Sequence, residues 1–153
     1  MLVHAAEDSF HKGLEHLDQG LKKEALAFFN GALEIERRMG GENHQARYLS
    51  YYGLSLQLTG GSRHEAVRYC RAAAKVEGYR PEICLNLGRV LLAANRRREA
   101  HKTLHWGLRM QPGHRQIVRE LKKMGLRRKP PLPFLPRTNT LNVLLGRMRR
   151  APA

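Results

Sequence analysis

The sequence predicts an all-α protein assembled from helix-turn-helix repeats, and three observations support this prediction. The 153 residues contain no convincing strand. Residues 81–112 form a complete unit in which the small residues Gly88 and Ala100 lie where two helices must approach closely, and Pro112 closes the unit. The segments before this unit repeat its spacing of small and large residues. The residues that supply its packing bulk are Leu87, Leu91 and Leu104.

The composition is sufficient for one ordinary domain. Hydrophobic residues make up 42% of the chain, which is enough to build a core without disulfides or a structural metal. Cys70 and Cys84 are too few for a disulfide framework, and the N-terminus lacks the basic start and apolar run of a secretory signal. No apolar run approaches the roughly 20 residues of a membrane-spanning helix. These features predict a cytoplasmic protein.

The first repeat is predicted over residues 6–38. When Gly13 is aligned with Gly88, three further positions fall into register across both helices. These positions pair Ala25 with Ala100, Phe29 with Leu104, and Ala32 with Gly107. Gly20 lies in the turn, where glycine adopts a positive φ at little cost. The second helix of this repeat is predicted over residues 22–38.

The second repeat is predicted over residues 46–78 and carries the same signals. Its equivalent residues are Gly53, Ala66, Cys70 and Ala73. Its inter-helix turn is one residue longer than that of the first repeat. Ser62 is a natural N-cap for the second helix, and Glu65 three residues later completes a capping box.

The third repeat, over residues 81–112, starts with Pro81 in the first helical turn, where a missing N–H costs nothing. A capping helix is predicted within residues 113–125, because a polar helix is expected to cover the last apolar face of a repeat stack. Its apolar side is formed by Ile117, Val118 and Leu121. Residues 126–153 then form a basic tail, in which Pro130, Pro131, Pro133 and Pro136 favour an extended path before a short amphipathic helix at its end.

The spacing of these units resembles that of the tetratricopeptide repeat (TPR), whose period is about 34 residues. The resemblance implies a right-handed α-solenoid of three TPR-like repeats with a C-terminal capping helix. The chain is accordingly divided into a repeat domain, 1–125, and a tail, 126–153. The part of the tail between Arg128 and Asn142 resembles a segment of some bacterial repeat proteins of no assigned activity, which suggests a bacterial source.

In the TPR family, the first helix of each repeat lines a concave groove that receives a partner peptide or helix. Transferring these groove positions implies a mainly apolar binding surface here. Its residues are Phe10, Leu14, Leu17, Arg47, Tyr51, Leu54, Leu58, Leu85, Asn86, Arg89 and Leu92, together with Glu7, Ser50 and Glu82. One TPR subgroup clamps a C-terminal carboxylate, but only Asn86 among the clamp positions is able to donate a hydrogen bond. Carboxylate capture is therefore not expected, and the leucines have packing between repeats as their alternative role.

The tail offers six apolar anchors, namely Leu132, Phe134, Leu135, Leu141, Leu144 and Leu145. Burying each side chain is worth about 1.5–3 kcal/mol. Ordering each tail residue costs roughly 1–2 kcal/mol of backbone conformational entropy. Summed over the whole tail, this cost nearly cancels the gain from burying the six anchors. This balance predicts that the tail docks weakly in its own groove, reaches a partner, or exchanges between copies in a homo-oligomer.

The formal net charge of +15 is concentrated near the C-terminus, because residues 101–153 hold 13 Lys and Arg but one acid, Glu120. The basic surface of the cap and tail consists of Arg119, Lys122, Lys123, Arg127, Arg128 and Lys129. Such a surface favours an acidic protein or peptide with an apolar anchor and speeds the encounter. Binding of RNA or DNA phosphates is the main alternative, although aromatic residues for base stacking are scarce there. Binding to an anionic membrane surface ranks below it.

The remaining candidate sites carry little signal. His101 and His105 share a helix face, but without a carboxylate or Cys at ligand spacing no metal site is predicted. Cys70 and Cys84 fall at packing positions, so buried thiols are expected, and Trp106 is assigned to packing under the cap. No nucleophile, base and orienting group occur together. The sequence therefore predicts a non-catalytic interaction scaffold or adaptor that uses no cofactor.

Overall fold

The computed structural model describes residues 2–40, 45–125 and 140–141. Within this part of the chain there are seven long α-helices and no strand. The helices are α1 (Leu2–Asp18), α2 (Lys22–Arg38), α3 (Ala46–Leu58), α4 (Arg63–Glu77), α5 (Pro81–Ala93), α6 (Arg97–Met110) and α7 (Arg115–Met124).

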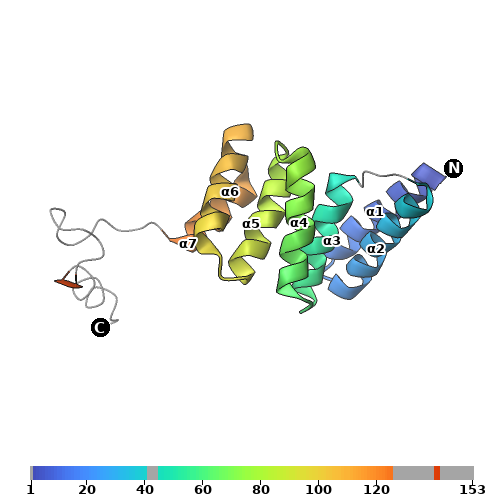
Figure 1. The fold of residues 1–153 in the computed structure, drawn as a ribbon, viewed down its shortest axis with the longest axis horizontal. Coiled ribbons are helices and arrows are strands. Elements are labelled where there is room, and N and C mark those ends of the chain that lie inside the picture. The colour runs from blue at the N-terminus through green and yellow to red at the C-terminus, as the bar shows by residue number, and fades with distance from the viewer. Residues whose placement is uncertain (1, 41–44, 126–139, 142–153) are drawn as a thin grey trace. The chain divides into compact units, whose positions relative to one another are not determined.

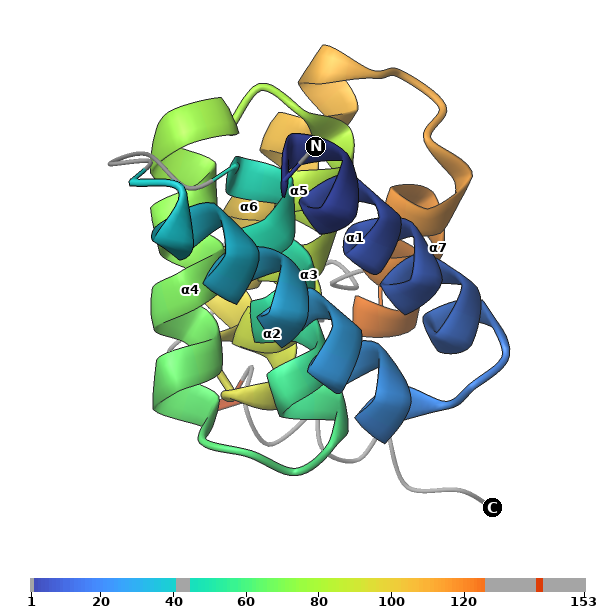
Figure 2. The ribbon, with the colours of Figure 1, turned by 90° about the vertical axis from the view of Figure 1, so that its right-hand side faces the viewer.

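The helices form pairs that stack in chain order. α1 packs on α2, α3 on α4 and α5 on α6, while α2 with α3, α4 with α5, and α3 with α5 join successive pairs. Figure 1 shows the pairs following one another from the blue N-terminal helices to the orange α6. In the view of Figure 2, α1 and α7 lie on one side of the stack and α4 on the other. The fold is an all-α helical-repeat solenoid, which confirms the predicted fold class.

Each pair is held by the same close contact between its two helices. A glycine on the first helix faces a buried side chain on the second, and a Cβ added to the glycine would come within 3 Å of that side chain. The equivalent contacts are Gly13 with Phe29 (2.6 Å), Gly53 with Cys70 (2.8 Å) and Gly88 with Leu104 (2.5 Å). Any larger residue would separate the helices, so the alignment of these glycines in the sequence is confirmed.

The second helix of each pair buries a row of small residues beside this contact. Five of these residues have no exposed surface, namely Ala25, Ala32, Ala66, Ala73 and Ala100. The sixth position is Gly107, which is also buried. Small side chains at these positions allow the helices to pack at short distances, as the sequence alignment predicts.

An aromatic cluster joins the first pair of helices to the second. The ring of Phe10 lies 5.5 Å from the rings of Phe29 and Tyr51 and 4.9 Å from that of Tyr48. Aromatic pairs at such distances add about 0.5–1.5 kcal/mol beyond the burial of their surface. Phe10, Phe29 and Tyr48 are almost completely buried, so this cluster is a principal part of the core.

The helix ends follow the local signals of the sequence. Ser62 caps α4, because its Oγ accepts a hydrogen bond from the backbone N–H of Glu65 at 3.3 Å. Pro81 occupies the first turn of α5. The turn inside each pair contains one residue with positive φ: Gly20 (80°), Gly60 (83°) and Asn95 (60°). These three positions are equivalent, since each lies seven residues after its contact glycine.

The chain divides into two units, residues 1–123 and 124–153, which we describe separately. Of the second unit, the structure describes only residues 124, 125, 140 and 141, and Leu141 is 53% exposed. The remaining predicted tail residues lie outside the described residues, namely Arg127, Arg128, Lys129, Leu132, Phe134, Leu135, Leu144 and Leu145. Among the described helices, none has the length and apolar character needed to cross a bilayer.

Candidate protein-binding face

The predicted groove residues lie on α1, α3 and α5, and the structure divides them into two sets. Seven side chains are partly exposed, and we call the surface that they form the odd-helix face: Leu14, Leu17, Arg47, Tyr51, Leu58, Arg89 and Leu92. Five others are at most 3% exposed: Phe10, Ser50, Leu54, Leu85 and Asn86. Glu7 is partly exposed and Glu82 is exposed. The five buried residues are not available to a ligand.

The five buried positions correct the predicted groove. Phe10 is enclosed by aromatic rings from α2 and α3, while Leu54 and Leu85 belong to the hydrophobic core. Asn86 and Ser50 share a buried hydrogen bond between helices. The sequence shows a broad apolar side on each helix, but it does not show which edge of that side meets the neighbouring helix. These residues hold the repeats together and do not line an open surface.

A polar link joins α1 to α3. Arg47 Nη2 donates a hydrogen bond to Glu7 Oε2 at 2.6 Å, and the Tyr48 hydroxyl donates to the same oxygen at 2.6 Å. The guanidinium of Arg47 also lies 5.2 Å from the centroid of the Phe10 ring, within cation–π range. Burial, followed by the hydrogen bond to Glu7, raises the pKa of Tyr48 well above its ordinary value. Arg47 is therefore already engaged by its own chain.

A second polar link joins α3 to α5. Asn86 Nδ2 donates a hydrogen bond to Ser50 Oγ at 3.1 Å, and both residues are at most 2% exposed. The thiol of Cys70 donates to the backbone oxygen of Ser50 at 3.4 Å. Asn86 is the one clamp position with a suitable donor, and the link commits that donor to the protein interior. This arrangement agrees with the expectation that the face does not grip a terminal carboxylate.

A third polar link joins α5 to α7. Arg89 Nε donates to Glu120 Oε1 at 3.1 Å, and Lys123 Nζ lies 3.5 Å from the same oxygen. Glu120 is only 7% exposed, and these two cations lie beside its carboxylate. This pair is not predicted from the sequence, because its two residues are 31 positions apart. The available indication is that Glu120 is the single acid among residues 101–153.

The three links leave the odd-helix face with a mainly apolar chemistry. Leu14, Leu17 and Tyr51 pack against the aromatic core on one side while remaining partly exposed on the other. Leu58 on α3 and Leu92 on α5 are further apolar side chains that are partly exposed. Burial raises the pKa of Tyr51, so its hydroxyl stays neutral at physiological pH. The face can bury apolar side chains of a ligand, but its two arginines are already paired.

The predicted basic surface is described only on α7. Arg119 and Lys122 are exposed there and have no ion pair within the described part of the chain, whereas Lys123 is paired with Glu120. The described cations therefore surround the outer side of α7, opposite the buried Ile117.

The assignment of Trp106 to packing under the cap is wrong. The indole is 47% exposed, and its Nε1 donates a hydrogen bond to the backbone oxygen of Gly78 at 3.0 Å. The neighbouring Gly107 is the residue that faces α7, because a Cβ there would lie 2.8 Å from Ile117. Trp106 does not lie on the side of α6 that carries the buried residues Ala100 and Leu104. Its position relative to these two residues in the sequence indicates an exposed side chain.

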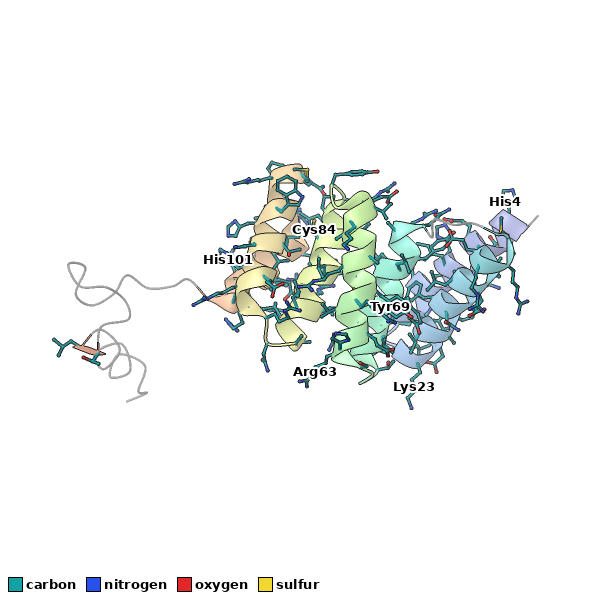
Figure 3. All side chains as sticks on the ribbon, viewed as in Figure 1. His4, Lys23, Arg63, Tyr69, Cys84 and His101 are labelled. Atoms are coloured by element: carbon teal, nitrogen blue, oxygen red, sulfur yellow. The ribbon has the colours of Figure 1, made fainter. Side chains whose placement is uncertain are left out.

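The histidines and cysteines of α4 to α6 lie in different environments. The rings of His101 and His105 are 4.3 Å apart, and Figure 3 shows His101 projecting outward from α6. The described residues contain no group of three or more His, Cys, Asp or Glu that could hold a metal. Cys70 and Cys84 are buried, as predicted, and burial raises their pKa values to about 12 and about 11. Both thiols are therefore neutral at physiological pH.

Comparison with known proteins supports the fold. No protein-family model matches the sequence, and no curated protein matches it. Among solved structures, the Arabidopsis OM64 TPR domain is similar, with a TM-score of 0.65 and 17% identity, over 82% of this chain and 98% of that domain.

Two further TPR domains that are similar were solved with bound peptides. The first TPR of Spaghetti (RPAP3), bound to the HSP90 peptide SRMEEVD, has a TM-score of 0.62 and 18% identity, over 78% of this chain and 89% of that one. The second TPR domain of human RPAP3, in complex with the HSP70 peptide SGPTIEEVD, has a TM-score of 0.63 and 17% identity, over 83% and 98%. At these identities the likeness shows the fold, which is that of TPR domains.

Proposed function

We propose that this protein is a non-catalytic scaffold or adaptor whose odd-helix face binds an apolar helix or extended peptide of a partner protein. The observation that carries the proposal is the run of partly exposed apolar residues on three successive odd-numbered helices, beside arginines that are already paired. An exposed apolar surface of this kind normally marks an interaction site. The peptide complexes of two similar TPR domains support this use of the fold.

The ligand is expected to differ from the acidic peptides in those two complexes. The positions that would clamp a terminal carboxylate hold Phe10, Leu14, Tyr51, Glu82 and Asn86. Two of these side chains are buried, and the exposed Glu82 would repel a carboxylate. Binding would then depend on apolar anchors, each worth about 1.5–3 kcal/mol before the costs of association.

The proposal also assigns roles along the chain. Residues 6–38, 46–78 and 81–112 are the three repeats, 113–125 is the cap, and 126–153 is a separate basic tail. The apolar residues of the tail make it a competitor for the odd-helix face, within one chain or between two copies. Removal of residues 126–153 is therefore expected to strengthen ligand binding, and an unchanged affinity would contradict this competition.

A peptide-display selection against the full chain tests the binding face. Selected peptides are then measured by calorimetry against a variant that carries Leu17→Glu and Leu92→Glu, since both residues are partly exposed on the face. We expect the affinity to fall by at least about tenfold, because two apolar contacts are replaced by charges. Leu21→Glu is the matched control, because Leu21 is 42% exposed and lies outside the face.

Two results would contradict the proposal. One is that all selected peptides bind the double variant and the control equally well while the helical content of both is unchanged. The other is that selection yields only peptides that require a free terminal carboxylate, because the chain offers no clamp for that group.

A further inference from the structure

The outer side of α6 carries a row of basic residues. Four of them follow one another at intervals of four, three and four positions, and we call them the α6 stripe: Arg98, Lys102, His105 and Arg109. Such intervals place side chains on one face of a helix. All four are exposed, opposite the buried Ala100, Leu104 and Gly107. At 1.5 Å per residue, the stripe is about 16 Å long.

The stripe has no acidic counterpart nearby in the sequence. Glu99 is the nearest acid, and it is held by Arg96 and by Arg71 of α4. The next acid along the chain is Glu120, which is paired with Arg89 and Lys123. None of the four stripe residues has an ion pair with any described residue.

Apolar surface flanks the stripe. Trp106 is 47% exposed, and Met110, one turn later on the same flank, is 40% exposed. The hydrogen bond from the indole to Gly78 fixes the ring while leaving much of its surface uncovered. A fixed, exposed tryptophan is a frequent centre of protein interfaces. The outer side of α6 therefore presents a cationic row beside an apolar row.

We propose that this surface is a second interaction site, which binds an acidic amphipathic segment of another protein. Acidic side chains of the segment would face the α6 stripe, and its apolar side chains would cover Trp106 and Met110. The site lies on an even-numbered helix and is separate from the odd-helix face, so it does not depend on the function proposed above.

The chain itself contains no suitable occupant. Residues 126–153 include seven Lys and Arg and no acid, so the tail would be repelled by the stripe. A second copy of the protein carries the same net charge of +15. A single-stranded nucleic acid would match the cations, but it binds best where several aromatic rings stack successive bases. Here the flank consists of one indole and the thioether side chain of Met110, and the other rings nearby are the small imidazoles of His101 and His105. This composition suits apolar side chains better than a row of stacked bases.

Trp106 makes the site directly observable, because it is the only tryptophan of the protein. The full chain is titrated with a set of synthetic acidic amphipathic peptides of about 16 residues. Each peptide carries a row of Glu and a row of Leu, and the position of one row relative to the other varies across the set. Twins with Lys in place of Glu, and an oligothymidylate, serve as comparison probes. We expect a saturable blue shift of the Trp106 emission with at least one acidic peptide and with no basic twin, and a weaker affinity at high salt.

Paired variants locate the response. The double variant Lys102→Glu with Arg109→Glu is expected to bind the acidic peptide at least about tenfold more weakly, since two attractive charges become repulsive. Lys22→Glu with Lys23→Glu, at the start of α2, changes the net charge equally and is expected to bind as the wild type does. Leu17→Glu with Leu92→Glu is also expected to leave the fluorescence response unchanged, which separates this site from the odd-helix face.

Three outcomes would overturn the inference. The first is that no acidic peptide in any register gives a saturable shift. The second is that the two charge-reversal pairs weaken binding equally, because the response would then reflect net charge alone. The third is that oligothymidylate shifts the emission and the acidic peptides do not, which would assign the surface to nucleic acid.

Discussion

The inward and outward surfaces of the even-numbered helices differ in how strongly the repeat constrains them. Inward residues are small or apolar and buried in all three helices: Ala25, Phe29 and Ala32; Ala66, Cys70 and Ala73; Ala100, Leu104 and Gly107. Outward residues vary. On α2 and α4, arginines pair with acids three residues earlier, as in Glu34–Arg37 and Glu65–Arg68, whereas the α6 stripe has no such pair among the described residues. Packing between helices determines the inward residues. The outward residues are not constrained in this way, so their pattern can be specific to a binding function.

The largest expected contrast is between Leu104→Ala and Trp106→Ala on α6. Leu104 is completely buried against Gly88, so its truncation leaves a cavity and costs about 2–5 kcal/mol of unfolding free energy. Trp106 is half exposed and makes one described hydrogen bond, so its truncation is expected to cost about 1 kcal/mol or less. Urea unfolding followed by circular dichroism measures both. Equal losses would show that Trp106 is structural and would weaken its assignment to a binding surface.

The next largest expected effect on stability concerns the polar link between α5 and α7, in which the carboxylate of Glu120 is buried. Arg89→Ala removes the main partner of Glu120 and leaves a carboxylate that is 7% exposed, which is expected to cost about 1–3 kcal/mol. Adding Glu120→Gln to this variant is expected to restore part of the loss, because the buried charge is removed. Lys122→Ala, on the exposed side of α7, is the control and is expected to change the unfolding midpoint little. If the free energy of unfolding did not recover in the double variant, the cost of Arg89→Ala would not come from an unpaired carboxylate on Glu120.

A smaller effect is expected where the third repeat departs from the other two. Gly107 replaces the alanines of the earlier repeats, and a Cβ there would lie 2.8 Å from Ile117 and 2.9 Å from Cys84. Overpacking costs about 1–3 kcal/mol, while the better helix propensity of alanine returns about 0.5–1 kcal/mol. Gly107→Ala is therefore expected to destabilise the protein by about 1 kcal/mol and to increase hydrogen exchange in α7. Unchanged exchange in α7 would contradict the role of Gly107 in docking the cap.

The sequence predicts the inward surface well, because short-range spacing controls it. Gly13, Gly53 and Gly88 are found by aligning segments that repeat after 40 and 35 residues, and each faces the equivalent position of its second helix, Phe29, Cys70 or Leu104. The odd-helix face is less predictable. The sequence does not reveal that Phe10 and Leu85 are buried while Leu14 and Leu92 are partly exposed, because that division depends on how neighbouring pairs stack.

The smallest expected effect tests the turn of the third repeat, where Asn95 (φ 60°) occupies the position of Gly20 and Gly60. Glycine adopts positive φ without the steric cost that a Cβ imposes, although asparagine tolerates this region better than most residues. Asn95→Gly is therefore expected to raise the unfolding free energy by about 0.5 kcal/mol, since relief of backbone strain outweighs the greater freedom of glycine in the unfolded chain. Gly60→Asn is the matched reverse change and is expected to lower it by a similar amount. Parallel thermal and urea unfolding of both variants measures the difference, and a loss of stability in Asn95→Gly would show that the asparagine side chain itself stabilises the turn.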